Sequence, residues 1–169
     1  MKTFTVNDFA KIAIVAALYV VLTITPPLNA ISYGAYQFRV AEMLNFLAFY
    51  NRKYIISLTI GCMIANFFSF GLIDVVVGSL STLVFVSLGV WLFERYMNER
   101  ILGGVFNKDF FFFAFFFSAS MVTVAAELAI VADAPFWMTW LTTALGELAS
   151  LLVGAIVIDR IAKRIDFTK

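Results

Sequence analysis

The positive charges of this chain gather on one side of any membrane through which its apolar runs are threaded. Of the 12 lysine and arginine residues, all except Arg39 fall in segments that share that side. Because lysine and arginine concentrate in cytoplasmic loops, this distribution predicts the orientation and places both termini in the cytoplasm. On the opposite side of the membrane and in the adjoining half of the apolar runs, five acids have only Arg39 to balance their charge. This excess of negative charge indicates a cationic ligand. These acids are Glu42, Asp74, Glu127, Asp133 and Glu147.

Hydrophobicity decides the class of protein. The chain is 63% apolar, its mean hydropathy is +0.96, and its charged fraction of 14% is well below that of soluble domains. Since a spanning helix needs about 20 largely apolar residues, 169 residues have room for about six spans in one integral domain, residues 1–169. We therefore expect an all-α multi-pass membrane protein whose partners are lipid and a small molecule, not nucleic acid.

Six apolar segments are expected to form the transmembrane helices. Pro26 and Pro27 end the first, because proline removes amide donors and disfavours helix in the preceding residue. The polar stretch 28–37 is expected to cap the outer surface or to enter a cavity. The second segment is short for a span and carries Arg39 and Glu42 on one helical face, where they either form a structural ion pair or contact a ligand. The segments are residues 8–25, 38–50, 54–70, 74–96, 110–131 and 136–158.

Polar residues recur along these segments at spacings of three and four, which places them on shared helical faces. For the hydroxyl groups, hydrogen bonds between helices are the simpler explanation. The four stripes are Thr59, Cys62 and Asn66; Asp74, Gly78, Ser81 and Thr82; Ser120, Thr123 and Glu127; and Trp140, Thr143, Glu147 and Ser150.

The carboxylates within the apolar segments are harder to explain by packing. A carboxylate at the centre of a membrane helix costs about 2.5–3.5 kcal/mol, and Arg39 alone cannot neutralise four of them. Either several of these carboxyl groups stay protonated or a cationic ligand binds to them. We favour a bound cation for Glu127 and Glu147. Asp74 is equally well explained as a helix cap, and Asp133 as a solvated turn residue.

Missing motifs argue against catalysis. The chain has no histidine, no GxxxxGK[ST] nucleotide-binding loop and no metal-ligand spacing. We expect no enzymatic activity, no cofactor and no metal. The energy for active transport would then come from a partner subunit or from an ion gradient.

The first apolar segment offers a face of small residues. Ala10, Ala13 and Ala17 share that face, and Ala13 with Ala17 makes a small-xxx-small pair through which another helix approaches closely. That helix belongs either to the chain's own bundle or to another subunit.

Together these features resemble a known class of transport proteins. Six short helices, cytoplasmic termini, the Ala13–Ala17 pair and the absence of a nucleotide site look like the substrate-binding S-component of an energy-coupling factor (ECF) transporter. The middle of the chain resembles, more closely, the QueT family of queuosine-precursor transporters. The residues that carry this resemblance are YQFRVAE (36–42), Gly61, Cys62, Ala65, Asn66, DVV (74–76), Gly78, Ser79, Thr82, Leu83, Gly146 and Glu147.

The resemblance implies a 7-deazaguanine ligand, namely queuine or its nitrile or aminomethyl precursor. Such a base presents ring and exocyclic amine donors to a carboxylate, and its carbonyl needs a donor. The positive aminomethyl form suits a site rich in acids, and aromatic side chains such as Trp140 are expected to stack on the ring. Glu127 and Glu147 are expected to bind the base or its ammonium group. The expected binding residues are Glu147, Glu127, Asn66, Gln37, Arg39, Glu42, Asp74, Trp140 and Tyr36.

The same resemblance implies partners in a prokaryotic plasma membrane. An ECF complex joins the S-component to a transmembrane coupling subunit and two ATPase subunits, and Ala10, Ala13 and Ala17 would form the docking face. Three alternatives remain open. They are a stand-alone proton-coupled transporter of an organic cation, an S-component for another vitamin, and a small intramembrane enzyme, which the absence of histidine disfavours.

Overall fold

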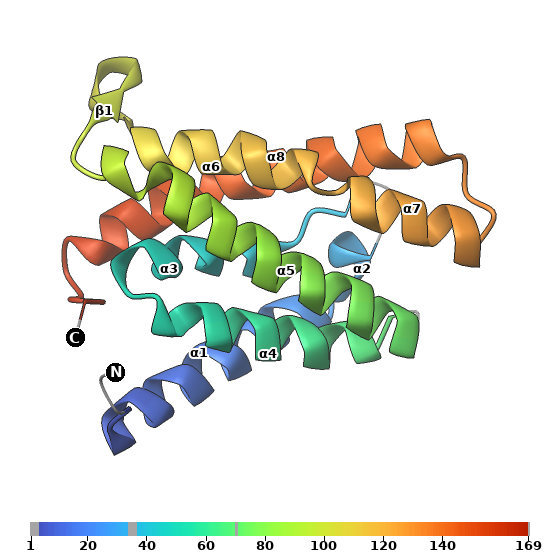
Figure 1. The fold of residues 1–169 in the computed structure, drawn as a ribbon, viewed down its shortest axis with the longest axis horizontal. Helices are drawn as coiled ribbons and strands as arrows, with labels where there is room; N and C mark the ends of the chain where they lie inside the picture. The colour runs from blue at the N-terminus through green and yellow to red at the C-terminus, as the bar shows by residue number, and fades with distance from the viewer. Residues whose placement is uncertain (1–3, 34–36, 70, 169) are drawn as a thin grey trace.

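Helices make up most of the protein (Figure 1). The computed structural model describes residues 4–33, 37–69 and 71–168. Its long helices run side by side, and the two ends of the chain lie at the same end of the bundle. The helices are α1 (Val6–Ile24), α2 (Leu28–Ser32), η1 (Val40–Phe46), α3 (Leu47–Tyr50), α4 (Lys53–Phe67), α5 (Leu72–Phe93), η2 (Glu94–Tyr96), η3 (Leu102–Gly104), α6 (Lys108–Ala119), α7 (Val122–Val131) and α8 (Phe136–Ala162). A hairpin pairs β1 (Arg100–Ile101) with β2 (Phe106–Asn107).

Four helical segments of the described chain are long and apolar enough to cross a membrane. They are α1, α5 with η2, α6 with α7, and α8. The other two expected spans are shorter: η1 and α3 together cover Val40–Tyr50, and α4 covers Lys53–Phe67. The all-α membrane class is thus confirmed, whereas the number of six spans and the cytoplasmic termini stay predictions.

The expected fifth helix is two helices. The prediction of one continuous helix over 110–131 is wrong, because α6 ends at Ala119 and α7 begins at Val122. At the break, the Ser120 hydroxyl donates to the Phe117 carbonyl at 2.6 Å, and the Thr123 hydroxyl donates to the Ser120 carbonyl at 3.0 Å. Such bonds from serine and threonine to the preceding turn compete with the helical ladder.

Two expected irregular regions are partly ordered. The polar stretch 28–37 contains α2, and residues 97–109, which connect the fourth and fifth expected segments, contain the hairpin. The hairpin is held to the end of α8, because Arg100 pairs with Asp159 at 2.9 Å and the Asn107 amide donates to the same carboxylate at 2.9 Å.

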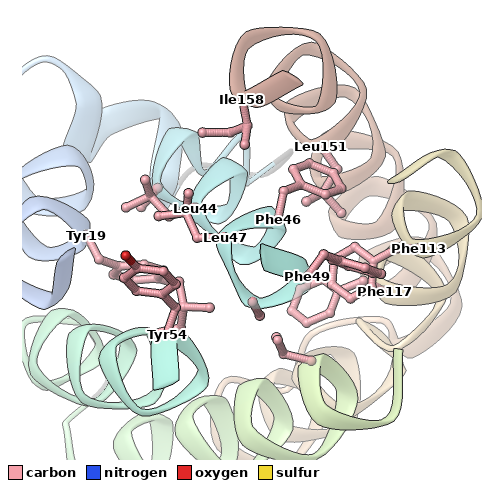
Figure 2. Packing of buried hydrophobic residues seen from close by; sticks show 14 of the residues in the cluster. Tyr19, Leu44, Phe46, Leu47, Phe49, Tyr54, Phe113, Phe117, Leu151 and Ile158 are labelled. Atoms are coloured by element: carbon pink, nitrogen blue, oxygen red, sulfur yellow. The ribbon is translucent and has the colours of Figure 1, made fainter. Parts of the chain in front are cut away.

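The short η1–α3 segment forms the centre of the core (Figure 2). Figure 2 shows Phe46 and Phe49 beside Phe113, with Tyr19 of α1 approaching from the opposite side. The ring centroids of Phe49 and Phe113 are 5.3 Å apart in an edge-to-face arrangement, which aromatic pairs prefer. Because η1 is surrounded by α1, α4 and α8, the side chains at its start are placed among three helices.

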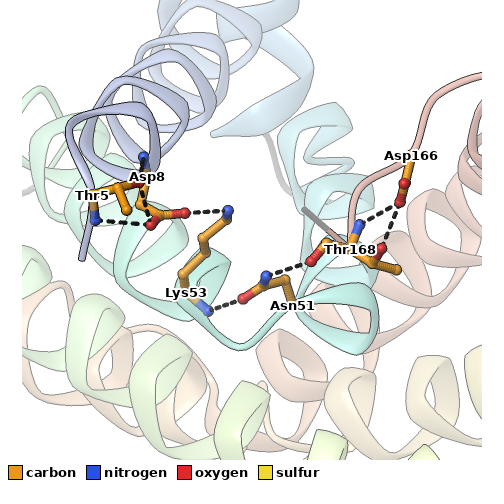
Figure 3. Close-up of polar contacts among 6 residues, drawn as sticks. All are labelled: Thr5, Asp8, Asn51, Lys53, Asp166 and Thr168. Atoms are coloured by element: carbon orange, nitrogen blue, oxygen red, sulfur yellow. Dashed lines mark hydrogen bonds and ion pairs between the residues drawn. The ribbon is translucent and has the colours of Figure 1, made fainter. Parts of the chain in front are cut away.

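Polar contacts close the end of the bundle that carries both termini (Figure 3). Thr5 and Asp8 form a capping box at the start of α1. The Asp8 carboxylate also pairs with the Lys53 ammonium at 2.7 Å, and Asn51 donates to the Thr168 carbonyl at 3.0 Å. The first helix, the α3–α4 turn and the C-terminal tail are therefore joined at one place.

Candidate functional site

Arg39 is a buried cation just before η1, with 7% of its surface exposed. Its Nε donates to the Ser32 carbonyl of α2 and its Nη1 donates to the Asn66 side-chain oxygen of α4, both at 3.4 Å. The guanidinium also lies 5.5 Å from the centroid of the Tyr33 ring, within the range of a cation–π contact. Arg39 thus joins η1 to α2 and α4.

The ion pair that was one of the two alternatives for Arg39 and Glu42 is not formed. Arg39 takes part in none of the ion pairs of the described residues. Glu42 instead accepts hydrogen bonds from the Tyr19 hydroxyl at 2.5 Å and from the Asn45 amide at 2.6 Å. A helical spacing of three brings two side chains to one face, but here other donors occupy both carboxylate oxygens.

Four acids nevertheless gather around Arg39, as their positions in the sequence suggested. Glu42 lies three residues after Arg39, and Asn66 bridges Arg39 to the Asp74 carbonyl. Ser150, three residues after Glu147, donates to the Arg39 carbonyl. Glu127 and Glu147 also interact electrostatically with Arg39. All four acids are 5% exposed or less. They come from η1, α5, α7 and α8, so the folded chain assembles the cluster from four separate segments. We call Arg39 and these four acids the acidic cluster.

Several oxygens of the acidic cluster have no hydrogen-bond partner within the described chain. They are Glu147 Oε1, both oxygens of Glu127, and Asp74 Oδ2. Buried polar atoms are nearly always hydrogen-bonded, so these atoms are candidates for contacts with a bound molecule. Asp74 does not act as a helix cap, because Gly71 occupies the cap position of α5 and Asp74 lies inside the first turn.

Asn66 orients Arg39. Its side-chain oxygen accepts from Arg39, while its amide nitrogen donates to the Asp74 carbonyl at 3.2 Å and to the Cys62 sulfur at 3.3 Å. Since these bonds use both ends of the amide, Asn66 connects Arg39 to the start of α5. The Thr82 hydroxyl also donates to Cys62, at 3.3 Å.

Three other predicted binding residues either have no hydrogen bond to the acidic cluster within the described residues or lie outside them. Trp140 points to the α6 side of α8, where its indole nitrogen donates to the Ala119 carbonyl at 3.1 Å and it lines an apolar groove with Phe115 and Leu148. Gln37 is buried and has a left-handed backbone, with φ of 39°. Tyr36 lies outside the described residues. The acid in the turn before α8, Asp133, is exposed, as expected of a solvated turn residue.

Two residues that hydrogen-bond to Glu42 were not predicted from the sequence. Asn45 is three residues after Glu42, and this spacing was a usable signal. Tyr19 stands among apolar residues of α1 and belongs to no polar stripe. Only the folding of α1 against α4 and η1 reveals its contact with Glu42.

The small residues of α1 face away from the bundle. Ala10, Ala13 and Ala17 are exposed, whereas Ile12, Ala16 and Tyr19 on the other side of the helix are buried. The alanine face therefore does not serve packing inside this chain.

Comparison with known proteins adds to this geometry. The model of the QueT transporter family matches residues 9–163. The chain is similar to the queuosine precursor transporter QueT of Lactococcus lactis subsp. cremoris (strain MG1363), with 60% identity over 169 residues and all of both chains covered. No solved structure matches the chain.

Proposed function

Because this chain belongs to the QueT transporter family, we propose that it captures a queuosine precursor outside the cell, as the S-component of an ECF-type importer. The family consists of transporters, and the apolar helices are those of a multi-pass protein of the cell membrane. The substrate of this chain would be a 7-deazaguanine, either queuine or its nitrile or aminomethyl precursor.

The observation that carries the proposed ligand is the set of buried, unpartnered oxygens on Glu127 and Glu147. A 7-deazaguanine presents adjacent N–H donors that one carboxylate accepts in bidentate fashion. The second carboxylate would bind the ammonium group of the aminomethyl form. Arg39, with its two long hydrogen bonds of 3.4 Å, is the donor available for the ring carbonyl.

The exposed alanine face of α1 supports the proposed partner. Small side chains let a second helix approach closely, and in lipid such packing drives helix association. Ala10, Ala13 and Ala17 would dock on the transmembrane coupling subunit, which works with two ATPase subunits. The chain itself would hydrolyse no ATP.

The ligand is tested by equilibrium binding of the three 7-deazaguanines to purified Glu147→Gln and Glu127→Gln proteins. Each change removes a charged acceptor but keeps the shape of the side chain, so we expect binding at least about 10-fold weaker. Asp133→Asn is the matched control, because Asp133 is an exposed acid outside the cluster, and it should bind as the parent does. If both glutamine variants bind like the parent, the assignment of the site is wrong.

The transport mechanism needs a separate test, in vesicles. Uptake should require the coupling and ATPase subunits together with ATP. Uptake by this chain alone, driven by a pH gradient, would contradict the S-component role and support a secondary transporter.

A further inference from the structure

Among the described residues of α1, Tyr19 is the side chain that hydrogen-bonds to the acidic cluster. Its side chain is 1% exposed, and its hydroxyl donates to Glu42 Oε1 at 2.5 Å. Hydrogen bonds to a carboxylate are shorter and stronger than those between neutral groups. The bond therefore fixes the direction in which one Glu42 oxygen points.

The position of Tyr19 depends on a close approach between α1 and α4. A Cβ atom at Gly61 would stand 2.8 Å from the Tyr19 Cβ and 3.1 Å from the Ala16 carbonyl oxygen. Both atoms are fixed by the α1 backbone, so any side chain at Gly61 would push α1, and Tyr19 with it, away from α4. Because Gly61 has no side chain, α1 lies close to α4 at the point where the Tyr19 hydroxyl bonds to Glu42.

Glu42 is held differently from the other three acids. Tyr19 and Asn45 occupy its two oxygens, whereas Glu127, Glu147 and Asp74 each have at least one oxygen without a partner in the described residues. Glu42 is thus suited to be a fixed counter-charge for Arg39, and the other acids are free to accept bonds from a ligand.

One helix carries both the contact with the cluster and the proposed docking face. Tyr19 is buried on one side of α1, while Ala13 and Ala17 are exposed on the other. Because the Tyr19 hydroxyl bonds to Glu42, the part of the site that Glu42 forms is tied to the helix that carries the docking face.

We propose that Tyr19 is a positioning residue for the ligand site: it fixes Glu42 beside Arg39 and thereby links α1 to the occupancy of the acidic cluster. This inference rests on the proposed function, because it concerns the same site. Tyr19 need not touch the ligand. Its effect on binding passes through Glu42.

The test is a double-mutant cycle with Tyr19→Phe and Glu42→Gln, measured both as thermal unfolding without ligand and as affinity for the 7-deazaguanines. We expect Tyr19→Phe to weaken binding about 10-fold, and the double variant to bind no more weakly than Glu42→Gln alone. Unfolding should show the same non-additivity, as expected for two residues in direct contact. Thr23→Val is the matched control, because its hydroxyl donates to the Tyr19 carbonyl within the same helix, and its affinity should stay within about twofold of the parent.

Gly61→Ala is a second variant that keeps the Tyr19 hydroxyl but displaces the ring, and it too should weaken binding. Additive effects of Tyr19→Phe and Glu42→Gln on affinity would overturn the proposal, even if their effects on unfolding were coupled. A parent protein that binds none of the precursors would instead contradict the proposed function. The unfolding cycle needs no ligand and would still decide whether Tyr19 holds Glu42.

Discussion

The side-chain amide nitrogen of Asn66 lies 1.9 Å from the place where a Cβ atom of Gly78 would stand. The α5 backbone therefore leaves the space that the Asn66 amide occupies between Arg39 and the Asp74 carbonyl. Gly78→Ala should displace Asn66 and release Arg39, so that precursor binding weakens about 10-fold. Equilibrium binding to the purified variant measures the effect.

Gly89→Ala is the control for this prediction. It lies on the same helix, and its Cβ would stand 2.5 Å from a Phe113 ring carbon, in the aromatic core. It should lower the unfolding temperature but leave the affinity within about twofold of the parent. Equal losses of affinity in the two variants would show that Gly78 acts through general packing.

The alanine face of α1 predicts a separation of binding from transport. In Ala13→Leu/Ala17→Leu, larger side chains would hold a partner helix away from α1. Complex formation with the coupling module and uptake should both be lost, while precursor affinity is unchanged. Ser87→Leu, at an exposed position of α5, is the control and should retain uptake. Loss of precursor binding in the double variant would indicate a role inside the bundle.

The ion pair of Asp8 with Lys53 predicts a loss of stability at the end that carries both termini. The Lys53 side chain is 3% exposed and that of Asp8 is 23% exposed. Asp8→Asn removes this ion pair and weakens the capping box at the start of α1, so it should lower the free energy of unfolding. The matched change Glu94→Gln breaks the exposed pair with Arg52, and such pairs contribute about 0–1 kcal/mol. Unfolding in detergent compares the two, and a larger loss for Glu94→Gln would contradict the prediction.

Tyr33 gives a prediction about pH. Its hydroxyl donates to the Ala65 carbonyl at 2.7 Å, and burial raises the pKa of Tyr33 to about 12 from the ordinary 10.0. A raised pKa means that the stability from this group is fully present below pH 10 and is lost as the pH rises toward 12. The stability difference between the parent and Tyr33→Phe should therefore stay constant from about pH 6 to pH 9. Thermal unfolding across that range measures it, and a difference that shrinks below pH 9 would be inconsistent with this pKa.

Apolar run length predicted the helical membrane class and four long helical segments, and local hydrogen bonding explains the break in one of them. Proline at positions 26 and 27 marked the end of α1 correctly, because its effect on the backbone does not depend on context. The break after Ala119 was missed, because Ser120 and Met121 are tolerated inside helices. Only the backbone bonds of Met121 to Ser118 and of Thr123 to Ser120, each spanning three residues, show that the ladder is interrupted.

For the site, the sequence predicted which charges come together but not how each is bonded. The cost of burying acids in a membrane pointed to Glu127 and Glu147, and both lie near Arg39. The contacts of Glu42 with Tyr19 and of Trp140 with Ala119 depend on how helices distant in sequence are rotated against one another. Helical spacing within one segment holds no information about that rotation.

The shortness of α4 has a consequence for the surrounding lipid. Its 15 residues rise about 22 Å along the axis, less than the roughly 30 Å of hydrocarbon in a typical bilayer. Ile60, Met63 and Phe67 are exposed along this helix, so acyl chains would cover it directly if it spans the bilayer as predicted. A helix shorter than the bilayer makes the adjacent leaflets thin locally, at an energetic cost. The energetic cost of this thinning should therefore be smaller in vesicles made from shorter-chain lipids than in those made from longer ones.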